Sequence, residues 1–166
     1  MIKLRPMEAT RADYQAMQDW FAEPELKQFV WCDEKGEGLV PLERIEEKYG
    51  GRVKEQKDVF PYFILNDGTP IGFIQYYLQG DDAIGLDMWI GVKGERSRGH
   101  GSEALRQMVA LIHEKHPDVH TLFIDPEVEN KRAVRCYEKA GFVHSGVFRD
   151  DEGDLCYMMK IEFEDM

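Results

Sequence analysis

The amino-acid sequence predicts one mixed α/β (α+β) domain, with a mostly antiparallel central sheet of about seven strands and helices on both faces. Two patterns carry this prediction. Strand-like and helix-like segments alternate in the second half of the chain, and hairpin turns separate the strand-like segments elsewhere. The 166 residues suit a single domain with its own core, and no repeat or linker divides residues 1–166.

The first third of the chain predicts one strand followed by helices. The segments are an edge strand over 2–6, a helix from Thr10 to about Phe21, a short helix over 26–31 and a helix from Pro41 to Tyr49. Threonine is a suitable cap for the first helix, and proline suits the opening of the last one. We expect the Gly50-Gly51 pair to end that last helix.

Strand signals dominate the middle of the chain. Three β-rich runs cover residues 60–66, 70–78 and 83–92. Asp67-Gly68 is a strong two-residue hairpin signal between the first two runs, and a second turn at 80–82 precedes the third. The three runs therefore predict an antiparallel meander.

The last third alternates between helix and strand. The segments are an amphipathic helix over 102–115, a strand over 119–124, a helix capped by Asn130 and stopped by Gly141, and two strands over 142–148 and 155–163. The strand over 119–124 is apolar at nearly every position, which is typical of a strand buried on both faces. The final two strands predict a closing hairpin.

Composition narrows the classes of function. The net charge of −11 disfavours nucleic acid as a partner. It either favours a cationic partner or only keeps the protein soluble. No apolar run approaches the ~18–20 residues of a membrane span, and the opening residues lack a signal-peptide pattern. Cys32, Cys136 and Cys156 are widely spaced and form no metal-ligand motif, so we expect a cytoplasmic protein without a metal or disulfides.

A glycine-rich turn precedes the 102–115 helix. Its candidate residues are Arg96, Arg98, Gly99, His100, Gly101 and Ser102. A helix N-terminus presents unpaired N–H groups and a positive dipole end, and glycine lets the backbone approach a ligand closely. The segment therefore predicts a phosphate or diphosphate site, with a purely structural tight turn as the alternative.

Two known phosphate-binding patterns fit this turn poorly. A P-loop requires a lysine that is missing here. Residues 99–104 spell the Rossmann pattern GxGxxA, and Asp125 lies near the offset expected for a ribose-binding acid. However, the preceding strand ends near Val92, and KGERSR separates it from the first glycine. Dinucleotide binding is therefore a rival hypothesis.

Two segments carry a resemblance to the GNAT N-acetyltransferases. RSRGHG at 96–101 matches that family's acetyl-CoA turn, [RQ]-x-x-G-x-[GA], and NKRAVRCYEKAGF at 130–142 resembles its downstream signature. Residues 4–21, 85–91 and 121–142 are similar to the aminoglycoside 6′-N-acetyltransferases, although Met88 and Val134 replace that subfamily's usual Gln and Ile. The resemblance covers nearly the whole chain apart from 31–60, and it implies the GNAT fold.

The resemblance also implies a set of acetyl-CoA contacts. The pantetheine arm would pair with the backbone of the third β-rich run like an added strand, and an N–H there would face the oxyanion. The tyrosine of the 130–142 signature would protonate the leaving thiolate. The implied contacts are Trp89, Ile90, Gly91, Val92, Arg96, Arg98, Gly99, His100, Gly101, Ser102, Asn130, Ala133 and Tyr137.

Acidic and aromatic residues are candidates for the acceptor site. Asp87 lies in an apolar strand, where an unpaired carboxylate is costly, so it either pairs with a cation, faces solvent or serves function. Asp125 ends a strand and is either a turn residue or a ligand for substrate ammonium groups. The resemblance implies that Asp87 is the base and amine anchor. Trp20 and Trp31 are expected to roof the acceptor pocket or to pack in the core.

The sequence thus predicts an acetyl-CoA-dependent enzyme that transfers an acetyl group directly to a primary amine of a polycationic small molecule. The resemblance implies the 6′-amine of an aminoglycoside, and hence antibiotic resistance. Alternative acceptors are a siderophore precursor, a polyamine or a protein N-terminus. A non-catalytic acyl-CoA-binding module is the alternative from another class. The protein is expected to be a monomer or a homodimer, with no nucleic-acid or membrane partner.

Overall fold

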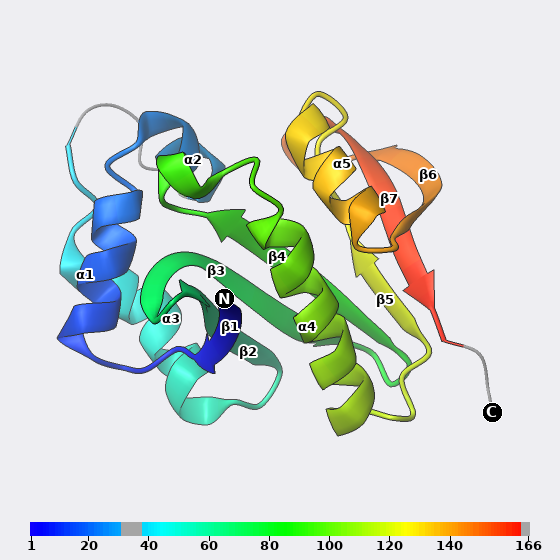
Figure 1. Ribbon diagram of the computed structural model, residues 1–166, viewed down its shortest axis with the longest axis horizontal. Helices are drawn as coiled ribbons and strands as arrows, with labels where there is room; N and C mark the ends of the chain where they lie inside the picture. The colour runs from blue at the N-terminus through cyan, green and yellow to red at the C-terminus, as the bar shows by residue number, and fades with distance from the viewer. Residues whose placement is uncertain (31–37, 164–166) are drawn as a thin grey trace.

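The computed structural model describes residues 1–30 and 38–163 and is built around one seven-stranded sheet (Figure 1). The strands are β1 (Ile2–Pro6), β2 (Val59–Asn66), β3 (Thr69–Gln79), β4 (Ala83–Ile90), β5 (Thr121–Ile124), β6 (Val143–Arg149) and β7 (Leu155–Glu162). Their order is β1-β2-β3-β4-β5-β7-β6, and only the β4–β5 pair is parallel. The predicted mixed, mostly antiparallel sheet is confirmed.

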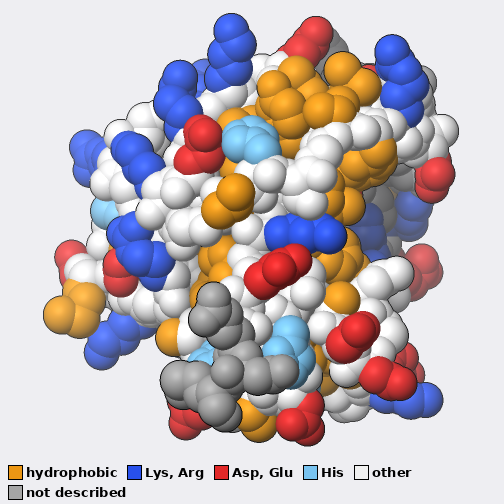
Figure 2. All heavy atoms as spheres, turned by 90° about the vertical axis from the view of Figure 1, so that its right-hand side faces the viewer, with side chains coloured by type: hydrophobic (Ala, Val, Ile, Leu, Met, Phe, Trp, Pro, Cys, Tyr) orange, Lys and Arg blue, Asp and Glu red, His pale blue; other side chains and the backbone are white. Residues whose placement is uncertain are grey.

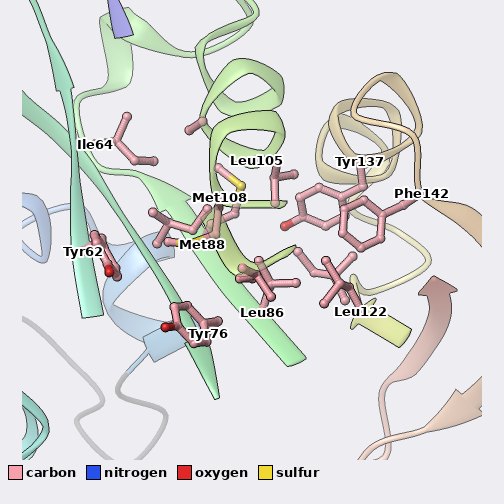
Figure 3. Close-up of a cluster of buried hydrophobic side chains, with 14 of the residues drawn as sticks. Tyr62, Ile64, Tyr76, Leu86, Met88, Leu105, Met108, Leu122, Tyr137 and Phe142 are labelled. Atoms are coloured by element: carbon pink, nitrogen blue, oxygen red, sulfur yellow. The ribbon is translucent and has the colours of Figure 1, made fainter. Parts of the chain in front are cut away.

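Helices cover both faces of this sheet. They are α1 (Arg11–Trp20), α2 (Pro24–Val30), α3 (Leu42–Glu55), α4 (His100–Lys115) and α5 (Lys131–Lys139), and a 3-10 turn, η1 (Lys93–Glu95), precedes α4. One apolar core joins the sheet to α4 and α5 (Figure 3), and a second joins the opposite face to α1 and α3. None of the helices in the described ranges has the length and apolar character of a membrane span.

Strand β4 contributes side chains to both cores. Leu86 and Met88 belong to the core under α4, whereas Trp89 packs into the core under α1 and α3. Because side chains alternate along a strand, Asp87 shares the face of Trp89. The α1–α3 face of the sheet therefore carries the candidate base.

Two local predictions are confirmed in detail. Asp67 and Gly68 have φ values of 50° and 86° and connect Asn66 to its strand partner Thr69, as a two-residue hairpin requires. The Thr10 side chain accepts a hydrogen bond from the Asp13 amide at 3.3 Å and caps α1. Both contacts are local, which is why the sequence predicts them.

The expectation that Gly50-Gly51 ends a helix is wrong. Helix α3 passes through both glycines and ends at Glu55, before Gln56 turns left-handed with a φ of 45°. Gly50 is buried, and a Cβ at this position would lie 3.1 Å from the Tyr14 hydroxyl oxygen of α1. Glycine is therefore present to allow close packing between two helices rather than to stop one.

Strand β6 forms the edge of the sheet opposite β1. Figure 2 shows this side of the molecule, where hydrophobic side chains gather in its upper part and charged side chains surround them. Val143 and Val147 of β6 and Leu155 of β7 are exposed by 67%, 55% and 41%. This edge therefore presents apolar surface to solvent.

Candidate active site

Strands β4 and β5 separate part-way along their length. Their parallel pairing joins three residue pairs, from Ala83 with Thr121 to Gly85 with Phe123. Strand β4 continues beyond this pairing to Ile90, while β5 ends one residue after Phe123. The second half of β4 thus has an open edge on the side of β5, in the middle of the sheet.

The backbone of β4 turns selected amides toward this opening. The N–H groups of Gly91 and Val92 both donate to the Ile71 carbonyl of β3, at 2.8 and 3.1 Å. Because amide direction alternates in an antiparallel ladder, the amides of Met88 and Ile90 face away from β3 and toward the opening. The Gly91 and Val92 amides are thus already used within the sheet, and the pairing of the 89–92 backbone with a ligand stays a prediction.

The glycine turn forms an uncapped helix N-terminus. Gly99 has a φ of 84°, a left-handed conformation that suits glycine. It is the N-cap residue of α4, and no side chain caps this end of the helix. The first intrahelical bond of α4 reaches the Gly99 carbonyl, so the amides of residues 100–102 precede the intrahelical ladder. A Cβ on Gly101 would lie 2.9 Å from Cys136 Sγ and 3.3 Å from Met88 Cε. The turn therefore presents amides at the positive end of the helix and is closely packed behind.

Arg96 serves a different purpose from the one expected of it. Its guanidinium nitrogens donate to both carboxylate oxygens of Glu23, at 2.8 and 2.7 Å, and its Nε donates to the Ile90 carbonyl at 2.9 Å. The predicted contribution of Arg96 to an anion site is corrected, because its charge is paired within the protein. Arg98 is exposed beside the turn, and His100 Nε2 lies 3.0 Å from a Glu95 carboxylate oxygen.

The 130–142 segment lies beside the opening as helix α5. The Asn130 side chain caps this helix by accepting the Ala133 amide at 3.2 Å, as predicted. The Tyr137 ring reaches from α5 toward the residues of α4 and β4 (Figure 3) and is only 8% exposed. Burial raises the pKa of Tyr137, so the phenol stays protonated at neutral pH. Its hydroxyl has no hydrogen-bond partner among residues 1–30 and 38–163.

Two carboxylates come from the two strands that border the opening, Asp87 from β4 and Asp125 from the end of β5. Asp87 Oδ2 accepts a hydrogen bond from Gln75 Nε2 at 3.0 Å. Burial raises the pKa of Asp87, and the Gln75 hydrogen bond opposes that shift. Asp125 follows β5 and is exposed as a residue, yet partial burial of its carboxyl and the nearby Asp87 charge raise its pKa to about 6. Both groups can attract a cationic amine and accept its proton.

The family model described as an acetyltransferase (GNAT) domain matches residues 9–149. The chain belongs to the GNAT acetyltransferase family. The separated strands, the uncapped turn before α4 and helix α5 all lie within the matched range. The predicted family and fold are confirmed.

Known acetyltransferases resemble this chain over most of its length. Aminoglycoside N(6′)-acetyltransferase type 1 of Klebsiella pneumoniae is 29% identical over 163 residues, which cover 91% of this chain and 79% of the relative. The crystal structure of aminoglycoside acetyltransferase AAC(6′)-Ib in complex with coenzyme A is 26% identical, with a TM-score of 0.80 and coverage of 98% of this chain and 95% of that one. Spermidine N-acetyltransferase from Vibrio cholerae, in complex with CoA and spermine, has a TM-score of 0.75 at 16% identity and shows the fold alone.

The GNAT acetyltransferase carries two site residues on β3 that the sequence analysis missed. Gln75 pairs with Asp87 across the β3–β4 ladder, and Tyr77 pairs with Gly85. A Cβ on Gly85 would lie 2.3–2.5 Å from the Tyr77 ring, so glycine makes room for that ring beside the carboxylates. The turn at 80–82 was the available signal, because it fixes the register that places these residues opposite one another.

The expected tryptophan roof of the acceptor site is corrected in part. Trp20 is only 6% exposed, and its ring centroid lies 5.2 Å from that of Phe63 in the core under α1 and α3. A Cβ on Gly91 would lie 2.2 Å from the Trp20 ring, so the indole is fixed against the end of β4. Trp20 is therefore a core residue, and Trp31 lies outside the described residues.

Three acidic side chains form a cluster whose geometry could hold a cation. Carboxylate oxygens of Glu127, Asp150 and Asp154 all lie within 4.8 Å of one another. Asp150 Oδ1 also accepts the amides of Glu152 and Asp154, at 3.0 and 2.9 Å, so the turn between β6 and β7 holds the Asp150 carboxylate in place. The group adds negative charge near Asp125, whose pKa the Asp150 charge also raises.

Proposed function

We propose that this GNAT acetyltransferase transfers the acetyl group of acetyl-CoA directly to a primary amine of a polycationic small molecule, the 6′-amine of an aminoglycoside. One observation carries the proposal, the set of groups around the opening between β4 and β5. Amides of β4 point into the opening, the uncapped N-terminus of α4 lies at one end of it, and the carboxylates of Asp87 and Asp125 lie nearby. The relatives named as aminoglycoside acetyltransferases support this choice of acceptor.

The chain's residues fit acetyl-CoA as a co-substrate. The amides of residues 100–102 would bind the diphosphate, with exposed Arg98 adding positive charge. The open edge of β4 would pair with the pantetheine arm through the amides of Met88 and Ile90. Helix α5, begun by Asn130 and Ala133, would cover the other side of the arm.

The same residues supply the chemistry of acetyl transfer. The Asp87 carboxylate would hold the substrate ammonium and accept its proton, and its raised pKa makes it a stronger base than an exposed aspartate. As the amine nitrogen bonds to the carbonyl carbon, an N–H of β4 would donate to the developing oxyanion. The carbon–sulfur bond then breaks, and the protonated Tyr137 hydroxyl would give its proton to the leaving thiolate.

A panel of acceptors tests the proposal. Purified protein is mixed with acetyl-CoA and either an aminoglycoside that carries a 6′-amine or its 6′-hydroxyl analogue, and both free CoA and product mass are measured. We expect acetylated product from the first compound only. Transfer to a polyamine, a siderophore precursor or a peptide N-terminus instead would reassign the acceptor. Acetyl-CoA binding without turnover on any amine would contradict the enzymatic proposal.

Asp87→Asn tests the role of the carboxylate in the same assay. Turnover should fall by about 10²-fold or more, because general-base and electrostatic assistance to the amine is lost. Acetyl-CoA affinity, measured by titration calorimetry, should stay at the wild-type value. A titration with NAD beside acetyl-CoA checks the dinucleotide alternative, which predicts that NAD binds more tightly.

The setting of the enzyme is also a proposal. We infer that residues 1–166 act as one domain, as a monomer or homodimer in the cytoplasm, where the free thiols of Cys136 and Cys156 would persist. Sedimentation equilibrium of the purified protein distinguishes the monomer from the homodimer.

A further inference from the structure

The side-chain amide of Gln75 lies between a cation and the candidate base. Gln75 is 8% exposed, and its Nε2 donates to Asp87 Oδ2 at 3.0 Å. Its Oε1 accepts a hydrogen bond from Arg52 Nη1 at 3.3 Å. Arg52 of α3, Gln75 of β3 and Asp87 of β4 are thus joined by a continuous chain of hydrogen bonds.

The charges at the two ends determine which way this amide points. A guanidinium only donates hydrogen bonds and a carboxylate only accepts them, whereas an amide has one accepting and one donating end. Arg52 therefore requires the amide oxygen, and Asp87 requires the amide nitrogen. Rotating the Gln75 amide by 180° would lose both hydrogen bonds and bring like partial charges together.

Arg52 is itself held in place by α3. Its guanidinium carbon lies 5.1 Å above the ring centroid of Tyr49, which is 1% exposed. On the other side, Gln75 and Asp87 are direct partners in the β3–β4 ladder. Both ends of the connection are therefore fixed by regular structure rather than by loops.

We propose that Arg52 and Gln75 are positioning residues, which hold the Asp87 carboxylate by Oδ2 so that Oδ1 points to the acceptor amine. This inference rests on the proposed function. Within the part of the chain that the structure describes, Oδ1 of Asp87 has no hydrogen-bond partner. A fixed carboxylate with one free oxygen suits an incoming ammonium better than a freely rotating one.

The electrostatics of the site indicate what this connection does for the base. Burial raises the pKa of Asp87, while the Gln75 hydrogen bond and the charges of Arg52 and Lys48 lower it. Removing the Gln75 donor should therefore raise the pKa of Asp87 further. Among the described residues, the charged and titratable groups that interact electrostatically with Asp87 are Lys48, Tyr49 and Arg52 from α3, Tyr77 from β3, Asp125 after β5 and Tyr137 from α5.

The pH dependence of Gln75→Leu tests the proposal. The variant should lose about 10- to 100-fold in kcat/KM for the amine at neutral pH, with the KM for acetyl-CoA unchanged. The acidic limb of its pH profile should move to higher pH, because a carboxyl with a higher pKa becomes the charged, working carboxylate only at higher pH. Gln79→Leu, at the exposed end of the same strand, is the matched control and should keep the wild-type profile.

Variants of Arg52 separate positioning from packing. Arg52→Met should shift the profile in the same direction but less, and Arg52→Lys should restore part of the activity by donating again to Gln75. A carbon-13 NMR titration of the Asp87 carboxyl, assigned with Asp87→Asn, measures its pKa even without turnover. An unchanged Asp87 pKa in folded Gln75→Leu would overturn the inference. If Gln75→Leu shows the shift in the Asp87 pKa but the wild-type protein acetylates no amine, the proposed function alone would be overturned.

Discussion

Glu23 and Arg96 form a two-bonded ion pair that joins the turn between α1 and α2 to the segment before α4. Both carboxylate oxygens of Glu23 accept guanidinium hydrogen bonds, at 2.8 and 2.7 Å, and the two side chains are 22% and 15% exposed. Paired bonds of this geometry are stronger and more directional than a single contact. The arginine of the predicted anion turn therefore fixes that turn to the connection between α1 and α2.

Glu23→Gln should destabilise the protein in a pH-dependent way. We expect a loss of about 1–2 kcal/mol in the free energy of unfolding at pH 7, measured by urea denaturation. Arg96 lowers the pKa of Glu23, so the stabilisation is complete above the ordinary glutamate pKa and disappears as the pH falls through the lower native value. The difference from wild type should therefore shrink in acid. Glu103→Gln, in an exposed pair with Arg106, should change stability by less than about 0.5 kcal/mol.

Tyr137→Phe should reduce turnover without reducing stability. Its hydroxyl has no partner among the described residues, so its removal should change the free energy of unfolding little, while kcat falls by about 10²-fold as the proton donor is lost. Tyr76→Phe should show the opposite pattern, because the Tyr76 hydroxyl lies 3.2 Å from His116 Nε2 at the C-terminal end of α4. Stopped assays and thermal unfolding of both variants provide the comparison. Equal kcat in Tyr137→Phe and wild type would remove the proposed proton donor.

Gly101→Ala should weaken acetyl-CoA binding by displacing the start of α4. The new Cβ would lie 2.9 Å from Cys136 Sγ, so either α4 or the cysteine must move. We expect the KM for acetyl-CoA to rise several-fold, and the added Cys136→Ala substitution to restore it by removing the sulfur. Gly94→Ala is the control, since a Cβ there has no atom within 4 Å. If the double variant stays as weak as the single one, the close packing is not the cause.

Acceptor binding should improve as the pH rises through about 6. Asp125 has its pKa raised to about 6, so it gains its charge in that range and attracts a substrate ammonium only above it. The KM for the amine, measured from pH 5 to 8, should therefore fall across this interval. Asp125→Asn should raise the KM at pH 7 and flatten the dependence, whereas exposed Asp118→Asn should leave it unchanged.

The features that the sequence predicts well are those set by neighbouring residues. The Asp67-Gly68 hairpin, the Thr10 cap and the Asn130 cap all depend on contacts within a few positions. The glycine turn and the helix that begins after Asn130 also follow from local spacing. For these, periodicity and turn chemistry were sufficient.

The features that it misses depend on contacts between distant segments. Gly50 suggests a helix end from the sequence alone, but the structure shows that it makes room for the Tyr14 hydroxyl of α1. Arg96 suggests a phosphate ligand until Glu23, 73 residues away, is seen beside it. The role of Gln75 depends on Arg52 and Asp87, which no local pattern connects to it.

The short parallel pairing of β4 with β5 has a consequence for the whole molecule. It leaves a four-stranded part and a three-stranded part of the sheet joined by three residue pairs. A co-substrate laid along the open edge would supply main-chain hydrogen bonds that the protein itself lacks there. At a concentration 100-fold above its dissociation constant, such a ligand adds about 2.7 kcal/mol to the stability of the native state. The lifetime of this enzyme against unfolding and proteolysis should therefore follow the cell's supply of thioester.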